Sequence, residues 1–317
     1  MQAWKRQATD AAAYLLVRLL VSVVQVLPAD MGDRMCRVLA WLLTGPIKIR
    51  YRVTRENIRR VFPDATEEEA AALMRSMWHS LLLMGCEIAW AQRRLHLCNW
   101  PRHIRFRQNR AMLRILLGRR PTVTVTGHFG NFEIGGYLIG LMGFQTTSIA
   151  RRLDNQFIDA WVKRFRSAKG QHLVDKEGSA PEVERLLRSG GALSLLADQH
   201  AGDKGCWVNF LGTPASCHKA LALFTLSSGA PMLAAYTRRI DGQPMRFESG
   251  CVGVADPADD PGKVCASVQT LTRWYNARLA EAIDMSVEQY WWLHRRWRQP
   301  PPKIAKRLQK AAMTQAA

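Results

Sequence analysis

The segment Gly127-His-Phe-Gly-Asn-Phe-Glu133 places a histidine and a carboxylate four intervening residues apart, beside two glycines. A neutral imidazole has an unperturbed pKa of ~6.5 and can accept a proton near neutral pH. A carboxylate bound to the second ring nitrogen would orient the imidazole and stabilise its charged form. The two side chains therefore predict a general base, His128, that Glu133 orients.

The elements around this segment favour a site at a strand end. Residues 121–127 are β-branched and bounded by proline and glycine, which predicts a buried strand, and Asn131 is a good N-cap for a helix. His128 would then lie at the carboxyl end of a strand, where open α/β sheets build their sites. The backbone N–H groups of Gly130 and Asn131, at the start of the helix, are candidates for stabilising an oxyanion.

Spacing alone does not make a site, because His172 and Glu177 have the same separation without flanking glycines. We expect His172 to be an ordinary surface or core residue. His128 and Glu133 could instead be metal ligands, but no third ligand at a telling spacing accompanies them. The chain has no Gly-x-Ser-x-Gly elbow, phosphate-binding loop, dinucleotide fingerprint or His-Glu-x-x-His motif, so we expect neither metal nor cofactor.

A second polar side chain, Asp198, follows an almost entirely apolar predicted strand, residues 192–198. The loop after it, residues 199–205, is polar and rich in glycine. Asp198 could share a cleft with His128, since the carboxyl ends of parallel strands meet at one edge of a sheet. It could equally be an N-cap or turn residue, and the residues alone leave both possibilities open.

Along the chain, helices dominate the first hundred residues, and strands alternate with helices from residue 121 onward. This order predicts an α/β fold with a mainly parallel central sheet flanked by helices. Capping boxes are expected at Thr66 and Ser179. The expected helices are 66–97, 131–142, 155–168, 179–190, 215–228 and 264–283, and the expected strands are 121–127, 144–150, 171–175, 192–198, 231–238 and 244–254.

Composition indicates a folded chain with an anionic partner. The 317 residues are 48% hydrophobic, and 45 basic against 26 acidic side chains give a net charge of +19. Nucleic acid and an anionic membrane are the two partners that such a charge suits. The seven cysteines show no paired or metal-ligand spacing, which favours reduced thiols facing the cytoplasm.

The N-terminal region favours the membrane. Residues 11–27 are apolar apart from Arg18, but this stretch is shorter than the ~20 residues of a comfortable span. With the arginines that follow it, the stretch predicts an interfacial or re-entrant anchor on an anionic leaflet. The alternative is the buried first helix of a soluble enzyme. We expect residues 1–60 to form a membrane-associating segment and residues 61–317 the α/β domain.

Several blocks together carry a resemblance to a known family. They are His128-x4-Glu133, Arg151 with Asn155 and Asp159, Arg164-Phe-Arg166-Ser, Asp198-Gln199 with Lys204-Gly205, Phe210-Leu-Gly-Thr-Pro214, and Gln289-Tyr-Trp-Trp-Leu-His-Arg-Arg296. In order and spacing the chain resembles the bacterial lipid A lauroyl/myristoyl acyltransferases, and more distantly the lysophospholipid acyltransferases. The resemblance implies an inner-membrane enzyme with a cytoplasmic site, in which residues 61–317 form the acyltransferase domain.

The resemblance also implies a reaction and its partners. A fatty acyl chain would move from acyl carrier protein, or from acyl-CoA, to a hydroxyl of a phosphorylated glycolipid, a lipid A precursor. His128 would deprotonate that hydroxyl without a covalent acyl-enzyme, and Arg151 and Arg166 would bind acceptor phosphates through their guanidinium forks. Asp198 and Gln199 would belong to the substrate site, with Asp198 organising the arginines rather than touching the chemistry.

Other functions remain open at this point. Relatives commonly carry proline where this chain has Arg152 and Gln156, so the acceptor headgroup could differ. A lysophospholipid or phosphatidylinositol mannoside type of acyltransferase is the nearest alternative. A basic nucleic-acid-binding protein is the alternative of another class. It accounts for the charge but leaves the apolar N-terminus and the His128 turn unexplained, so we expect no nucleic-acid partner.

Overall fold

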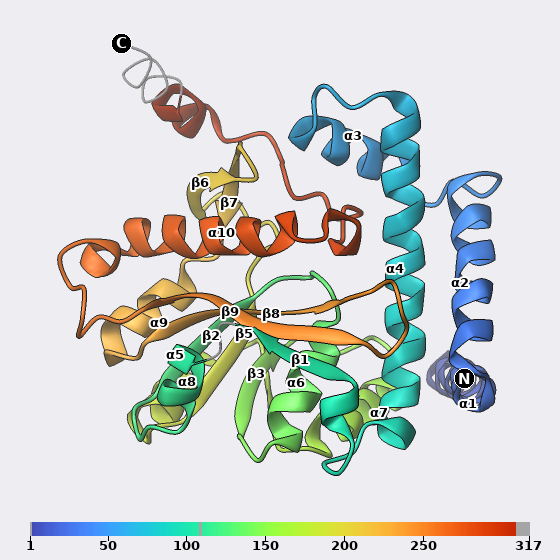
Figure 1. Ribbon diagram of the computed structural model, residues 1–317. Helices are drawn as coiled ribbons and strands as arrows, with labels where there is room; N and C mark the ends of the chain where they lie inside the picture. Colours follow the sequence, from blue (N-terminus) through green and yellow to red (C-terminus); the bar gives the residue numbers. More distant parts are fainter. Residues whose placement is uncertain (1, 108–109, 309–317) are drawn as a thin grey trace.

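The computed structural model describes residues 2–107 and 110–308, which form a central sheet flanked by helices (Figure 1). The seven strands of this sheet lie in the order β1-β9-β8-β2-β5-β3-β4, and every neighbouring pair is parallel except β8 and β9. The strands are β1 (Ile104–Arg107), β2 (Thr122–Thr126), β3 (Thr146–Ala150), β4 (Gln171–Asp175), β5 (Ala192–Leu196), β8 (Met232–Arg239) and β9 (Phe247–Ala255). The predicted α/β fold with a mainly parallel sheet is confirmed.

Helices cover both faces of the sheet, with α10 on one side and α6 and α7 on the other (Figure 1). Asn131 and Asn155 cap α6 and α7 through their side chains, because an asparagine oxygen satisfies the N–H groups that the first helical turn leaves unpaired. The helices of this domain are α5 (Arg110–Leu116), α6 (Phe132–Leu141), α7 (Gln156–Ser167), α8 (Ala180–Arg188), α9 (Ala220–Ser228) and α10 (Val268–Asp284), with 3-10 turns η1 (Trp100–Arg102), η2 (Val264–Ala266) and η3 (Val287–Gln289).

Four helices precede the sheet, and the longest, α4, runs the height of the molecule beside α2 (Figure 1). They are α1 (Gln2–Val26), α2 (Ala29–Thr44), α3 (Tyr51–Val61) and α4 (Glu67–Arg94). The capping box predicted at Thr66 is present, with Glu69 as its partner. The buried Trp90 of α4 donates its indole N–H to Val24 O at 2.6 Å, which fixes the end of α1 against α4.

The helix α1 is longer than the apolar stretch read from the sequence. Its residues Arg6–Val26 form a 21-residue segment of mean hydropathy 1.5, long and apolar enough to cross a membrane by length and composition. Only 6% of that segment is buried, so the alternative of a buried first helix is wrong. Leu16, Leu19 and Leu20 are 68%, 63% and 60% exposed. Exposed apolar surface that is concentrated in this way is typical of a site that contacts a membrane or another protein.

Two local predictions were wrong. Ser179 makes no side-chain cap for α8, because its hydroxyl donates to Lys176 O at 3.2 Å instead. The predicted helix 215–228 begins only at Ala220, and the residues before it pair in an antiparallel hairpin of β6 (Cys206–Phe210) and β7 (Thr213–Cys217). The tight turn at Leu211-Gly212, with both residues at positive φ, connects these strands.

Candidate active site

The register of the two central strands brings His128 and Asp198 together. In the parallel pair β2 and β5, Thr126 lies opposite Leu196, so the residues two positions further along each strand also face one another. His128 Nδ1 lies 2.8 Å from Asp198 Oδ1. Of the two possibilities left open for Asp198, the structure therefore favours a place beside the histidine, and the expectation that Asp198 organises arginines was wrong.

Asp198 is held as a buried carboxylate. It is 1% exposed, and Gly127 approaches it so closely that a Cβ at that glycine would lie 3.3 Å from Asp198 Cγ. Burial raises the pKa of this carboxyl, but the adjacent His128 outweighs it and lowers the pKa to about 2. Asp198 is therefore ionised near neutral pH, and it accepts the proton on His128 Nδ1 in a hydrogen bond that fixes the tautomer and orientation of the ring.

The other ring nitrogen of His128 points toward an amide. Gln199 Nε2 lies 3.3 Å from His128 Nε2 and 3.1 Å from His294 Nε2. With the Gln199 amide nitrogen in this position, it donates hydrogen bonds and the two Nε2 atoms accept them. Burial, helped by the neighbouring His128, lowers the pKa of His294 to about 4, which keeps it neutral. His128 Nε2 thus carries the free electron pair of a general base.

Three aromatic rings lie close to the imidazole of His128. Phe132, Trp291 and His294 lie with their ring centroids 5.3, 5.0 and 5.2 Å from that of His128. The backbone N–H of Trp291 donates to His128 O at 3.0 Å, so the C-terminal segment is bound directly to the turn. These contacts exclude water from one side of the base.

Glu133 does not contact His128 in the way expected. Both of its carboxylate oxygens accept hydrogen bonds from Arg166 of α7, one of them at 3.0 Å. Glu133 lies in the first turn of α6, while the Nδ1 atom that it was expected to hold is already bound to Asp198. The structure corrects the predicted orienting contact, and the pair formed by Glu133 and Arg166 instead joins α6 to α7.

The two amides predicted to hold an oxyanion already have partners. Gly130 N–H donates to Gln289 O at 3.0 Å, and Asn131 N–H donates to Thr237 O at 2.8 Å. Gly130 has a φ of 60°, and a Cβ there would lie 2.0 Å from Thr237 O, so only glycine fits this close approach. The prediction of an oxyanion hole at these two amides is wrong for this arrangement.

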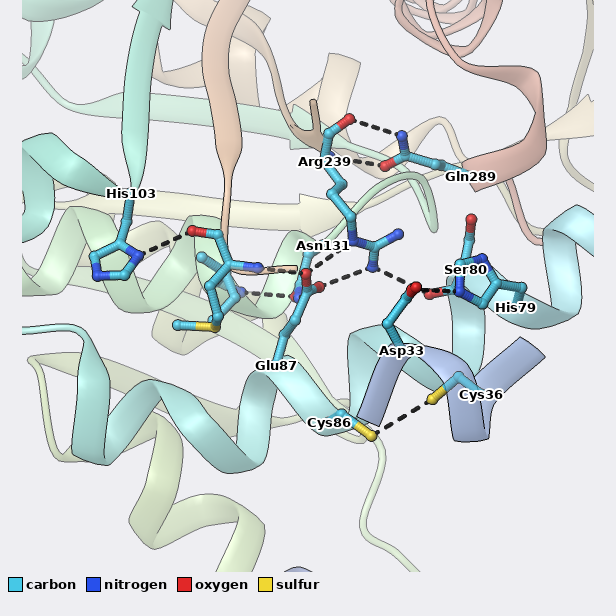
Figure 2. Close-up of polar contacts among 12 residues, drawn as sticks. Asp33, Cys36, His79, Ser80, Cys86, Glu87, His103, Asn131, Arg239 and Gln289 are labelled. Atoms are coloured by element: carbon cyan, nitrogen blue, oxygen red, sulfur yellow. Dashed lines mark hydrogen bonds and ion pairs between the residues drawn. The ribbon is translucent and has the colours of Figure 1, made fainter. Parts of the chain in front are cut away.

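A buried ion pair between Glu87 and Arg239 lies next to Asn131, in the turn that follows β2 (Figure 2). Glu87 of α4 is 0% exposed and accepts from Arg239 Nε and Nη2, each at 2.8 Å, and from Asn131 Nδ2 at 3.0 Å. Gln289 binds the backbone of Arg239 through both ends of its amide. The charge pair and its hydrogen bonds therefore connect α4, α6, β8 and η3 around the residues that follow β2.

The remaining predicted site residues lie apart from the dyad or are already paired. Arg151 has a side chain 82% exposed, and its nearest carboxylate is Asp154 at 3.5 Å. Arg166 is engaged with Glu133, so for both arginines phosphate binding stays a prediction. His172 is exposed on β4, as the sequence indicated. In the described part of the chain, no three His, Cys, Asp or Glu side chains gather where they could hold a metal ion.

Sequence reasoning missed the contribution of His294. Its signal was present in the run Tyr290-Trp-Trp-Leu-His-Arg-Arg296, but a cluster of tryptophans and arginines suggested packing or a membrane interface equally well. The bridge between Phe129 and Tyr290 and the bond from Trp291 to His128 bring this run to the site. Both connect residues far apart in sequence, so no local pattern could reveal them.

Comparison with known proteins identifies the family of the chain. Residues 2–299 match the family described as bacterial lipid A biosynthesis acyltransferase. The chain is 24% identical over 304 residues to the lipid A biosynthesis lauroyltransferase of Escherichia coli, covering 93% of this chain and 91% of that protein. It is 23% identical over 262 residues to the E. coli lipid A biosynthesis palmitoleoyltransferase, covering 80% and 81%. The chain therefore belongs to the bacterial lipid A biosynthesis acyltransferase family and is an acyltransferase.

Proposed function

We propose that the protein transfers a fatty acyl chain from acyl carrier protein to a hydroxyl of a phosphorylated glycolipid, a lipid A precursor. The observation that carries the chemistry is the geometry of His128, whose Nδ1 is bound to the buried Asp198 carboxylate while Nε2 keeps its electron pair. The acceptor class is supported by the family and by the names of the two E. coli relatives.

The proposed reaction is a direct transfer. The acceptor hydroxyl first displaces the Gln199 amide from His128 Nε2. This nitrogen then takes the hydroxyl proton as the hydroxyl oxygen attacks the thioester carbonyl carbon. The new ester C–O bond forms, the C–S bond breaks, and the proton on His128 passes to the departing thiolate. Asp198 stabilises the imidazolium formed in between, and proton transfer by a positioned base is worth ~10²–10⁴-fold in rate. Gln199 is then well placed to polarise the carbonyl.

Membrane association is part of the proposal. The exposed leucine face of α1 supports an anchor, and a net charge of +19 favours the anionic cytoplasmic leaflet of the inner membrane. Such an anchor would keep the enzyme at the surface of the bilayer that holds its acceptor. The acceptor could then reach the site by lateral diffusion within the membrane. The same positive charge favours an acidic protein as donor, which is the reason to prefer acyl carrier protein over acyl-CoA.

A transfer assay with two donors and two acceptors tests the proposal. Purified protein in detergent is given acyl carrier protein or CoA thioesters together with a lipid A precursor or a lysophospholipid, and products are identified by mass spectrometry. We expect one added acyl ester on the lipid A precursor, fastest from the carrier protein, and none with His128→Ala. A faster reaction on the lysophospholipid would show that the acceptor class is wrong, and an active His128→Ala variant would refute the base.

A further inference from the structure

A cavity of about 570 Å³ lies beside the dyad, and three arginines line it, Arg50, Arg295 and Arg298. Arg50 precedes α3, and the other two belong to the C-terminal segment, which passes close to α3 (Figure 1). Gln199 and His294 line the same cavity, and the Gln199 amide lies 3.3 Å from His128 Nε2. Gln199 therefore lies between the cavity and the nitrogen that would act as base.

These three guanidinium groups have no carboxylate partner among the residues that the structure describes, although they line one cavity. Within residues 2–107 and 110–308, no carboxylate lies at ion-pair distance from any of them. Arg50 has one hydrogen bond, to the neutral Leu293 O at 3.2 Å. By contrast, Arg296 is buried and bound to Ser216 O at 2.6 Å. Arg296 thus anchors the segment, while Arg295 and Arg298, without a carboxylate partner in the described chain, present charge to the cavity.

The backbone of Arg50 adopts an unfavourable conformation at the edge of the cavity. Arg50 has a φ of 51° and a ψ of 21°, a left-handed conformation that non-glycine residues adopt uncommonly. The α3 residue Asn57 donates to Trp292 O at 2.7 Å and to His294 O at 2.5 Å, so α3 clamps the C-terminal segment. Hydrogen bonds therefore connect the two walls of the cavity, which are formed by the start of α3 and by the C-terminal segment.

Positive charge outweighs the nearby carboxylate of Asp203 at His200. The pKa of His200, which also lines the cavity, is lowered by burial and then by the positive charges of Arg298 and Arg296. His200 Nδ1 is buried without a hydrogen-bond partner. A cavity that holds three guanidinium groups and an unpartnered imidazole is suited to a doubly charged anion, since guanidinium matches phosphate oxygens bidentately.

We propose that this cavity binds a phosphate group of one of the two substrates and thereby holds the reacting group at His128. The inference rests on the proposed acyl transfer. It assigns phosphate binding to Arg50, Arg295 and Arg298, three residues for which the sequence had not predicted that role. The phosphate could be that of the glycolipid acceptor or the phosphodiester of the pantetheine arm on the donor, and the shared chemistry is a phosphate that lies next to the site.

Kinetics of the double variant Arg295→Gln/Arg298→Gln distinguish the two sources. If the acceptor phosphate binds here, KM for the phosphorylated acceptor rises roughly 10–100-fold with kcat little changed, while a dephosphorylated acceptor reacts equally with variant and wild type. If the donor phosphate binds here, KM for the donor rises instead. The matched control is Arg273→Gln, which removes an exposed arginine of α10 outside the cavity and should change neither constant.

A binding experiment keeps the proposal testable even if the acyl transfer is wrong. Trp291 stacks on His294 with ring centroids 5.8 Å apart, so an anion in the cavity should alter tryptophan fluorescence. We expect pyrophosphate to give a saturable change in wild type and in Arg273→Gln, and a much weaker one in the double variant. Equal titrations of all three proteins, together with unchanged KM values for both substrates, would overturn the proposal.

Discussion

His128 Nδ1 and Asp198 Oδ1 lie 2.8 Å apart although 70 positions separate the two residues in the chain. The contact depends on the parallel register of β2 and β5, which places the ends of both strands at one edge of the sheet. It is therefore a property of the fold rather than of any local motif. Replacing either residue should leave that register intact, which makes the pair suitable for mutational tests.

The first prediction separates the two carboxylates that could orient His128. Asp198→Asn should lower kcat by roughly 10²–10⁴-fold, because an amide cannot hold the required tautomer or stabilise imidazolium. Glu133→Gln should lower it much less, since Glu133 binds Arg166 instead. Steady-state kinetics and circular dichroism of both variants check this. Greater damage from Glu133→Gln in a folded protein would restore Glu133 as the orienting group.

The second prediction compares two histidines. His128→Ala should abolish transfer in a protein that still folds, and it should lower the free energy of unfolding by about 1–3 kcal/mol, because the buried Asp198 carboxylate loses its partner. His172→Ala should be nearly silent in both measurements, because His172 is exposed on β4. Activity assays and urea denaturation of the two variants provide the test. Equal losses of activity would mean that His128 has no special role.

The third prediction concerns the pair of Glu133 and Arg166, whose side chains are 14% and 25% exposed. Removing one partner leaves a partly buried charge unpaired, so each single change to glutamine should cost about 1–3 kcal/mol of unfolding free energy. The double change should cost less than the sum of the two single changes. A double-mutant cycle by urea denaturation measures this coupling, and strict additivity would show that the pair does not stabilise the fold.

The fourth prediction follows from the pKa of Asp198, which is about 2 in the folded protein. The unfolded value is ~3.9, so the folded state binds fewer protons between these values. The contribution to stability is therefore complete above ~3.9 and is lost as the pH falls through the folded pKa. The difference in unfolding free energy between wild type and Asp198→Asn should shrink over this range. A constant difference would contradict the lowered pKa.

The fifth prediction tests the anchor. Changing Leu16, Leu19 and Leu20 to serine should release the protein from anionic vesicles, because burying each leucine contributes about 1.5–3 kcal/mol. The matched change of the same residues to methionine should leave binding intact. High salt should loosen the wild type only in part and detergent fully, since apolar burial is not screened. Wild type that stays in solution with anionic vesicles at low salt would show that α1 is not an anchor.

The sequence predicted the fold better than the contacts within the site. Period and capping located β2, α6 and β5, and two predicted strand ends did meet in one cleft. The pairing of Glu133 with Arg166 was not predictable, because it depends on how α6 and α7 pack beside each other on one face of the sheet. The same holds for Gly130 and Asn131, whose amides were expected at a helix start but face the carbonyls of Gln289 and Thr237. Local patterns locate a residue on an element, and tertiary packing decides what it binds.

The bonds between the His128 turn and residues 289–294 have a consequence for synthesis of the protein on the ribosome. The helix α1 precedes every strand of the sheet in the chain, so it leaves the ribosome before them. The base, in contrast, remains without Trp291 and His294 until nearly the whole chain has been produced. A chain that ended before residue 289 would thus have the His128 turn without the hydrogen bonds and ring contacts that residues 289–294 supply.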